Sequence, residues 1–186
     1  MNFELSFVKL KLVTMVSDST KVPCKVFEAT VGRDDENQTG SNEKVLKLAL
    51  LGCECKPPYG PIDHTARMFL EMLVESAKSA KLAIKILMDI YNVVEYAYPK
   101  NWDEYNGVIV PGSFSAAYDS DPWIDELKAK LQEHVVKGEL PTLGVCFGHQ
   151  VLAHSFETGT TIHPQNGPWA GRVSMPFQTD LVDLYV

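Results

Sequence analysis

The stretch from residue 140 to residue 150, LPTLGVCFGHQ, constrains the fold more than any other part of the chain. It begins as a short apolar run typical of a strand and continues into a Gly-x-Cys-x-Gly turn, after which a helix can begin. In a turn this tight the side chains around the central residue must be small, which explains glycine at positions 144 and 148. The pattern predicts a nucleophile elbow, with Gly144 and Gly148 as its flanking glycines and the Cys146 thiol presented at a strand end.

The expected place of Cys146 has a chemical consequence. The unpaired N–H groups and the dipole at the start of the following helix favour a thiolate over a thiol. A thiolate held in this way is suited to attack a carbonyl carbon. The alternative is an ordinary buried cysteine, since this residue type is common in protein interiors. The two glycines and the preceding strand favour the elbow.

Three segments resemble one known family. The sequence CFGHQ at residues 146–150 resembles the signature of class I glutamine amidotransferases, which release ammonia from glutamine through a cysteine thioester. The sequence YNGVIVPGS at residues 105–113 is similar to the strand and glycine turn that supply the oxyanion hole of that family. The sequence NGPWAGR at residues 166–172 is similar to a segment of the branch with gamma-glutamyl peptidases and GMP-synthase-like proteins. The resemblance spans roughly residues 45–175 and implies a flavodoxin-like fold.

The resemblance also implies roles for individual residues. When a thiolate attacks a carboxamide, the oxygen becomes an anion that two backbone N–H donors can stabilise. One donor would be the N–H of Phe147, the residue after the nucleophile, and the other, by resemblance, the N–H of Gly112. Gln150 resembles the family glutamine that contacts the substrate. Without the resemblance, Gly112 could simply turn the chain after a strand, and Gln150 would be an ordinary helix residue.

A cysteine hydrolase of this kind needs a general base and a residue that orients it. The family takes both from a His-x-Glu-type motif well downstream of the cysteine, and neither His-x-Glu nor His-Pro-Glu follows Cys146 here. His149 lies in the signature, where the family does not use it as the base, and His154 would lie within the elbow helix. His163 is the remaining candidate. We therefore expect an incomplete triad, in a domain truncated at its C-terminus and lacking its last strands.

The segments around the elbow alternate between strand and helix patterns. Apolar runs predict strands at residues 45–53, 83–91 and 107–110, and helical periodicity predicts helices at residues 62–81 and 122–138. Asp63 and Asp121 are the expected N-caps of these helices. The alternation predicts an open, mostly parallel α/β sheet with helices on both faces. Ligands bind beyond the carboxyl ends of such strands, where both Gly112 and Cys146 fall.

The two ends of the chain differ from this pattern. Residues 1–44 are expected to form an N-terminal extension and flexible linker, because residues 32–42 are almost wholly polar. A mis-predicted start of the chain is the alternative. Residues 45–175 would be the class I glutamine amidotransferase-like domain, and residues 176–186 an atypical tail. A length of 186 residues with 45% hydrophobic content is consistent with one domain and a well-buried core.

Charge and cysteine content restrict the class of protein. Seventeen basic against 24 acidic residues give a net charge of −7, which argues against a nucleic-acid partner. We recognise neither a secretory signal nor an apolar run of the ~18 residues that would span a membrane, so we expect no membrane partner and a cytoplasmic protein. The four cysteines are then expected to be reduced. Residues 53–55, Cys-Glu-Cys, lack the second pair or nearby histidine of a zinc site.

The sequence thus predicts a glutamine amidotransferase-type hydrolase of γ-glutamyl amide bonds that works through a cysteine thioester and is impaired by the missing histidine and glutamate. A thiolate and two backbone amides suffice for this chemistry, so neither a metal nor an organic cofactor is expected. The expected partners are a small-molecule substrate, glutamine or a γ-glutamyl compound, and possibly a synthase protein. Two alternatives remain open. One is a gamma-glutamyl peptidase acting on glutathione-like compounds, favoured by residues 169–172, and the other is a non-catalytic regulatory or binding homologue.

Overall fold

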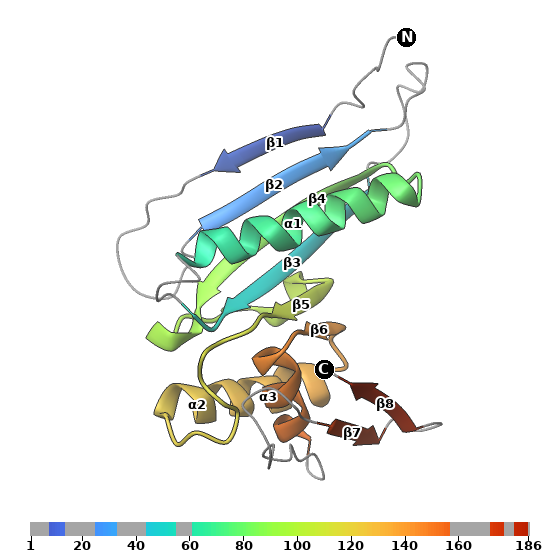
Figure 1. Ribbon diagram of the computed structural model, residues 1–186. Coiled ribbons are helices and arrows are strands. Elements are labelled where there is room, and N and C mark those ends of the chain that lie inside the picture. The colour runs from blue at the N-terminus through green and yellow to red at the C-terminus, as the bar shows by residue number, and fades with distance from the viewer. Residues whose placement is uncertain are drawn as a thin grey trace.

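A computed structural model describes the backbone of residues 8–13, 25–32, 44–54, 61–156, 172–176 and 181–185, and the side chains of the second, third and fourth of these ranges. The strands are β1 (Val8–Val13), β2 (Lys25–Val31), β3 (Lys44–Gly52), β4 (Ile84–Asn92), β5 (Gly107–Val110), β6 (Thr142–Gly144), β7 (Arg172–Pro176) and β8 (Leu181–Tyr185). The helices are α1 (Ile62–Ser79), α2 (Pro122–Lys130) and α3 (Phe147–Ser155) (Figure 1). Two short 3₁₀ turns, η1 (Val93–Glu95) and η2 (Trp102–Glu104), and the π-helical η3 (Leu131–Val136) complete the described elements.

The main sheet has the strand order β1-β2-β4-β3-β5-β6, and β7 and β8 form a separate antiparallel pair. β3 pairs in parallel with both β4 and β5, and β5 pairs in parallel with β6. Numbered along the chain, these four parallel strands lie in the order 2-1-3-4, which is the order of flavodoxin-like sheets. The predicted fold class, an open α/β sheet with helices on both faces, is confirmed.

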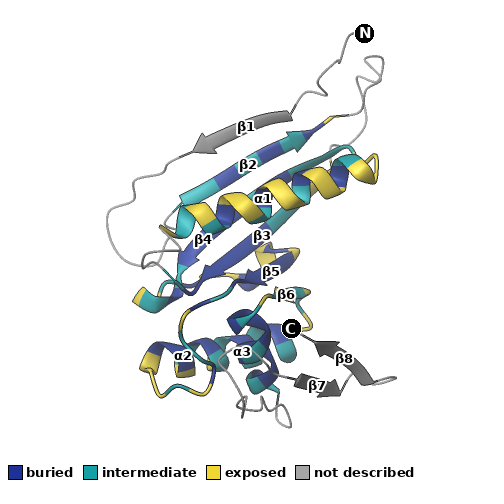
Figure 2. Ribbon diagram, viewed as in Figure 1, coloured by how far each residue is buried: buried dark blue, intermediate teal, exposed yellow. Residues whose placement is uncertain are grey.

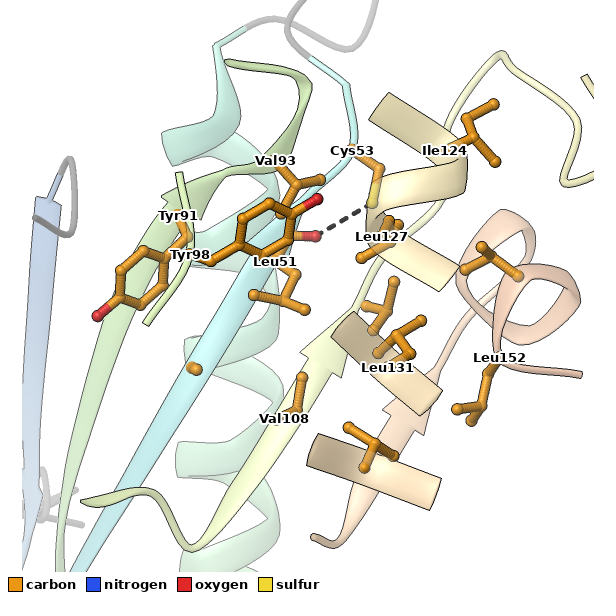
Figure 3. Close-up of a cluster of buried hydrophobic side chains, with 14 of the residues drawn as sticks. Leu51, Cys53, Tyr91, Val93, Tyr98, Val108, Ile124, Leu127, Leu131 and Leu152 are labelled. Atoms are coloured by element: carbon orange, nitrogen blue, oxygen red, sulfur yellow. Dashed lines mark hydrogen bonds between the residues drawn. The ribbon is translucent and has the colours of Figure 1, made fainter. Parts of the chain in front are cut away.

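The central strands are buried on both faces, because helices cover each face of the sheet (Figure 2). On one face, Leu48 and Leu50 pack with the buried residues of α1. On the other face, Ala49 and Leu51 pack with residues of α2, η3 and α3. Figure 3 shows part of this second cluster, in which Leu51 lies among side chains from several elements. Each fully buried leucine contributes about 1.5–3 kcal/mol relative to an exposed one, so these two clusters hold the layers together.

Of the two predicted N-caps, Asp121 is confirmed in position and Asp63 is wrong. The N-cap residue of α1 is Pro61, and Asp63 lies in the first turn, where it forms an ion pair with Lys25 of β2. Asp121 does occupy the N-cap position of α2, but its side chain makes no capping hydrogen bond. An acidic residue near a helix N-terminus can act through the helix dipole alone, which explains why sequence pattern does not separate the two roles.

Part of the expected N-terminal extension lies in the sheet. β2 pairs with β4 in an antiparallel ladder, and its residues Phe27, Ala29 and Val31 are buried against the α1 side. Their spacing of two is the period of a strand with one buried face, a signal that the sequence does contain. The boundary at residue 44 stays a prediction, since residues 33–43 lie outside the described part of the chain. Among the described helices, none has the length and apolar character needed to cross a membrane.

Candidate active site

The turn between β6 and α3 holds Cys146 in an unusual backbone conformation. Only Val145 and Cys146 separate the end of the strand from the start of the helix. Cys146 has φ 55° and ψ −115°, a region that residues other than glycine rarely adopt. Such a conformation costs on the order of 1–3 kcal/mol and persists only where surrounding structure imposes it. The geometry is that of a strand–turn–helix elbow with a cysteine at its apex.

The two flanking glycines have a steric reason. A Cβ at position 148 would lie 1.8 Å from the carbonyl oxygen of Val110, and one at position 144 would lie 2.7 Å from the carbonyl oxygen of Gly148. Both contacts are with backbone atoms, which cannot rotate away as a side chain can. Gly144 and Gly148 therefore allow α3 to start directly against the ends of β5 and β6. Their part in presenting a nucleophile remains a prediction.

Gly112 lies beside Cys146. β5 and β6 are neighbours in the sheet, so the residues that follow them emerge at the same edge. A Cβ at position 112 would lie 3.6 Å from the Cys146 Cβ and 4.0 Å from its Sγ. Glycine at this position leaves open the space next to the thiol. The structure thus brings Gly112 and Cys146 together from two separate segments of the sequence.

Phe147 and Gln150 both belong to α3. Phe147 is the first residue of the helix, so its N–H has no partner within the helix and lies at the positive end of the helix dipole. Its ring is buried and packs against Trp123, with the ring centroids 5.5 Å apart. The Gln150 N–H donates to the Cys146 carbonyl oxygen at 3.1 Å, and the Gln150 residue is half-buried. The first turn of α3 thus contains an N–H without a partner inside the helix and the half-buried Gln150.

The histidines lie in different surroundings. His149 is buried, burial lowers its pKa, and its Nε2 has no hydrogen-bond partner among the residues that the structure describes. Burial, followed by the charge of Lys128, lowers the pKa of His154 on the same helix. His134 of η3 stacks on the Trp102 ring, with centroids 4.6 Å apart. His163 and the segment 166–171 lie outside the described residues. None of these positions assigns the general base.

One contact near the site has no counterpart in the sequence-based expectations. The Phe114 N–H, two residues beyond Gly112, donates to Glu54 Oε2 at 3.2 Å. Glu54 follows β3, and the sequence analysis considers it only within Cys53-Glu54-Cys55, a run that lacks the other ligands of a zinc site. An acidic residue two positions after a buried strand is the signal that could have indicated a role at this edge of the sheet. Cys55 lies outside the described residues.

Comparison with known proteins decides the family. The family model described as "Glutamine amidotransferase class-I" matches residues 64–180, more than half of the chain and including the elbow. The chain belongs to the class I glutamine amidotransferase family. The predicted family is therefore confirmed.

Curated relatives of this class I glutamine amidotransferase chain carry two kinds of name. It is 31% identical to gamma-glutamyl peptidase 5 of Arabidopsis thaliana over 50% of this chain and 38% of that protein. It is 29% identical to the putative glutamine amidotransferase YLR126C of Saccharomyces cerevisiae over 65% of this chain and 51% of that protein. It is 28% identical to gamma-glutamyl peptidase 2 of Arabidopsis thaliana over 50% of this chain and 38% of that protein. The chain thus matches about half or less of the length of these relatives.

Among solved structures, this class I glutamine amidotransferase chain is similar to a glutamine amidotransferase from Methylobacillus flagellatus. The identity is 19%, the match covers 61% of this chain and 39% of that one, and the TM-score is 0.36.

Proposed function

We propose that this chain uses Cys146 as the nucleophile that cleaves γ-glutamyl amide bonds, including that of glutamine. The observation that carries the proposal is the positive φ of Cys146 at the junction of β6 and α3, with Gly112 beside its thiol. A strained residue at a strand–helix turn is typical of an activated nucleophile. Membership of the class I glutamine amidotransferase family supports this choice of reaction.

The proposed reaction has two stages. The Cys146 thiolate attacks the γ-carbonyl carbon, and the N–H groups of Gly112 and Phe147 stabilise the oxyanion, while Gln150 helps to fix the substrate. The C–N bond then breaks, the leaving amine takes a proton from a general acid, and a γ-glutamyl thioester remains on Cys146. Water attacks the thioester, loses a proton to the same group and releases the γ-carboxylate and the thiol. The residue that carries this proton is not assigned, and the reaction needs no cofactor.

The test is hydrolysis of glutamine by the chain and by its Cys146→Ala variant. Ammonia release that is present in the first and lost in the second supports the proposal, provided that circular dichroism shows both to be folded. Mapping of a glutamine-like chloroketone to Cys146 by mass spectrometry gives a second readout that needs no complete triad. Equal ammonia release by both proteins would overturn the proposal.

A second candidate is a gamma-glutamyl peptidase that acts on glutathione-like compounds. Two of the relatives described above carry this name, which favours the candidate. Comparing release of ammonia from glutamine with cleavage of a γ-glutamyl dipeptide separates the two substrates. Faster cleavage of the dipeptide would favour the peptidase.

A third candidate is a non-catalytic homologue that binds or regulates. A folded chain that binds glutamine in calorimetry but shows neither hydrolysis nor labelling of Cys146 would support this candidate. If ammonia is produced, the proposed protein partner is a synthase that consumes it.

A further inference from the structure

The segment that carries Gly112 is tied to the elbow on one side. The Pro111 carbonyl oxygen accepts a hydrogen bond from the Gly148 N–H at 3.1 Å, and the Val110 carbonyl oxygen accepts one from the Val145 N–H at 2.9 Å. The Pro111 carbonyl and the Gly112 N–H belong to the same planar peptide group. The first of these bonds therefore restrains the orientation of the Gly112 N–H from its N-terminal side.

In the loop that follows Gly112, two side chains form hydrogen bonds with the backbone of the same loop. The Ser113 hydroxyl oxygen accepts from the Ser115 N–H at 3.2 Å. The Asp119 carboxylate accepts from the Ala116 N–H at 2.7 Å. Both bonds join residues of the same loop, so they fix its internal shape but not its position against the sheet.

Glu54 supplies a link between this loop and another strand. Its Oε2 accepts the Phe114 N–H at 3.2 Å, across 60 positions of sequence. Glu54 lies two residues beyond β3, whose last five residues are buried between two neighbouring strands and two helical layers. The Glu54 carboxylate thus lies just beyond the end of a well-packed strand, which limits its movement.

Burial along the loop is uneven around Phe114. The Phe114 side chain is 52% exposed, so burial of its ring does not hold the backbone in place. The next fully buried apolar side chain along the loop is Ala117, five residues after Gly112. Ser113, between Gly112 and Phe114, is buried, and the hydrogen bond from the Phe114 N–H to Glu54 adds a restraint at the exposed residue that follows it.

We propose that Glu54 is a positioning residue, whose carboxylate holds the Phe114 N–H and thereby keeps the Gly112 N–H beside the Cys146 thiol. This inference rests on the proposed function, because Gly112 matters for catalysis only if Cys146 attacks a carbonyl. Glu54 acts as a hydrogen-bond acceptor, and its charge is not needed. A negative charge near a developing oxyanion is in fact unfavourable by Coulomb repulsion.

Three substitutions at Glu54 test its hydrogen-bond acceptor and its negative charge separately. Glu54→Gln keeps an acceptor oxygen at the same reach and removes the charge, whereas Glu54→Ala removes the acceptor. Glu54→Asp keeps the charge and shortens the side chain by one methylene. Glu71→Ala, on the exposed surface of α1, is the control for loss of one negative charge.

The experiment compares two electrophiles on the full chain, so that turnover is not required. A chloroketone analogue of glutamine develops an oxyanion when the thiolate attacks, and iodoacetamide reacts by displacement without one. We expect Glu54→Ala and Glu54→Asp to label about tenfold more slowly than the native chain with the chloroketone, and Glu54→Gln to stay within about twofold of it. Iodoacetamide should label all of them, and Glu71→Ala, at the native rate. Hydrogen exchange at the Phe114 amide should become faster in Glu54→Ala and remain slow in Glu54→Gln.

The outcomes distinguish this inference from the proposed function. If glutamine fails to protect the native chain against the chloroketone, the proposed function falls and the role of Glu54 falls with it. If glutamine protects but Glu54→Ala labels at the native rate, only the role of Glu54 is overturned. The role of Glu54 is also overturned if the chloroketone labels Glu54→Gln as slowly as Glu54→Ala. It is overturned as well if iodoacetamide labels Glu54→Ala more slowly by the same factor as the chloroketone does. Should Glu54→Ala fail to fold, the comparison of Glu54→Asp with Glu54→Gln decides.

Discussion

The backbone N–H of Gly148 donates a hydrogen bond to the carbonyl oxygen of Pro111 at 3.1 Å, and this bond joins the elbow helix to the end of β5. The two residues are 37 positions apart in the chain and come together because β5 and β6 are neighbours in the sheet. The bond requires α3 to approach the β5 backbone at a distance that only glycine allows. The geometry of the elbow and the packing of α3 therefore depend on the same close approach.

This close approach makes Gly148→Ala strongly destabilising. The added Cβ would lie 1.8 Å from the Val110 carbonyl oxygen, so α3 or β5 must move. We expect the free energy of unfolding to fall by more than about 3 kcal/mol, the range of severe steric changes in a core. Urea denaturation followed by circular dichroism measures the change. Gly32→Ala is the matched control, since no residue that the structure describes lies within 4 Å of its added Cβ, and an equal loss in both variants would contradict the explanation.

A buried polar network on β4 gives a second prediction. The Tyr105 hydroxyl donates to Asp89 Oδ2 at 2.7 Å and lies 2.7 Å from the Tyr91 hydroxyl. Burial, followed by its bonds to Tyr91 and Asp89, raises the pKa of Tyr105, so the hydroxyl stays protonated near neutral pH. Tyr105→Phe removes the donor and leaves a buried carboxylate short of one partner, at a cost of about 1–3 kcal/mol.

The free energy of unfolding of Tyr105→Phe should be compared with that of Tyr96→Phe. Tyr96 is 52% exposed, so loss of its hydroxyl should change stability by no more than about 0.5 kcal/mol. Equal stability of both variants would show that the Tyr105 hydroxyl contributes nothing to the network.

Local elements of this fold can be predicted from the sequence, whereas several contacts between those elements cannot. The elbow around Cys146 and the strand preceding it could be predicted, because glycine spacing and apolar runs act within a few residues. The bond from Phe114 to Glu54 joins residues 60 positions apart, and no local pattern reports such a contact. The strand β2 is partly predictable. The sequence contains the spacing of two at Phe27, Ala29 and Val31, which are buried in the structure, but only the pairing with β4 shows that this strand belongs to the sheet.

Burial of two histidines in α3 predicts a loss of stability in acid. The folded-state pKa of both His149 and His154 lies below the ordinary value of 6.5. Between about pH 6.5 and the lower folded-state pKa, these histidines are protonated in the unfolded chain but not in the folded chain. The free energy of unfolding therefore falls as the pH drops through about 6.5, and it stops falling below the folded-state pKa. Above about 7.5, where both states are neutral, these two residues add no pH dependence.

Replacement of His149 by leucine should reduce this acid sensitivity. Leucine is similar in reach and does not titrate, so the difference in unfolding free energy between pH 7.5 and pH 5.5 should be smaller in His149→Leu than in the native chain. His64→Leu is the control for the substitution itself, because His64 lies on the exposed surface of α1. An unchanged pH dependence in His149→Leu would mean that His149 takes up a proton as readily in the folded state as in the unfolded chain.

The backbone conformation of Cys146 leads to a prediction about stability rather than catalysis. At φ 55° and ψ −115° alanine is strained and glycine is not, so Cys146→Gly should be more stable than Cys146→Ala by about 1–2 kcal/mol. At an exposed position inside a helix the order is the reverse, because glycine costs about 1 kcal/mol relative to alanine there. Position 71 of α1 supplies that comparison through Glu71→Gly and Glu71→Ala. Urea denaturation of the four variants tests the idea, and a preference for alanine at position 146 as well would mean that the elbow stores no strain at its cysteine.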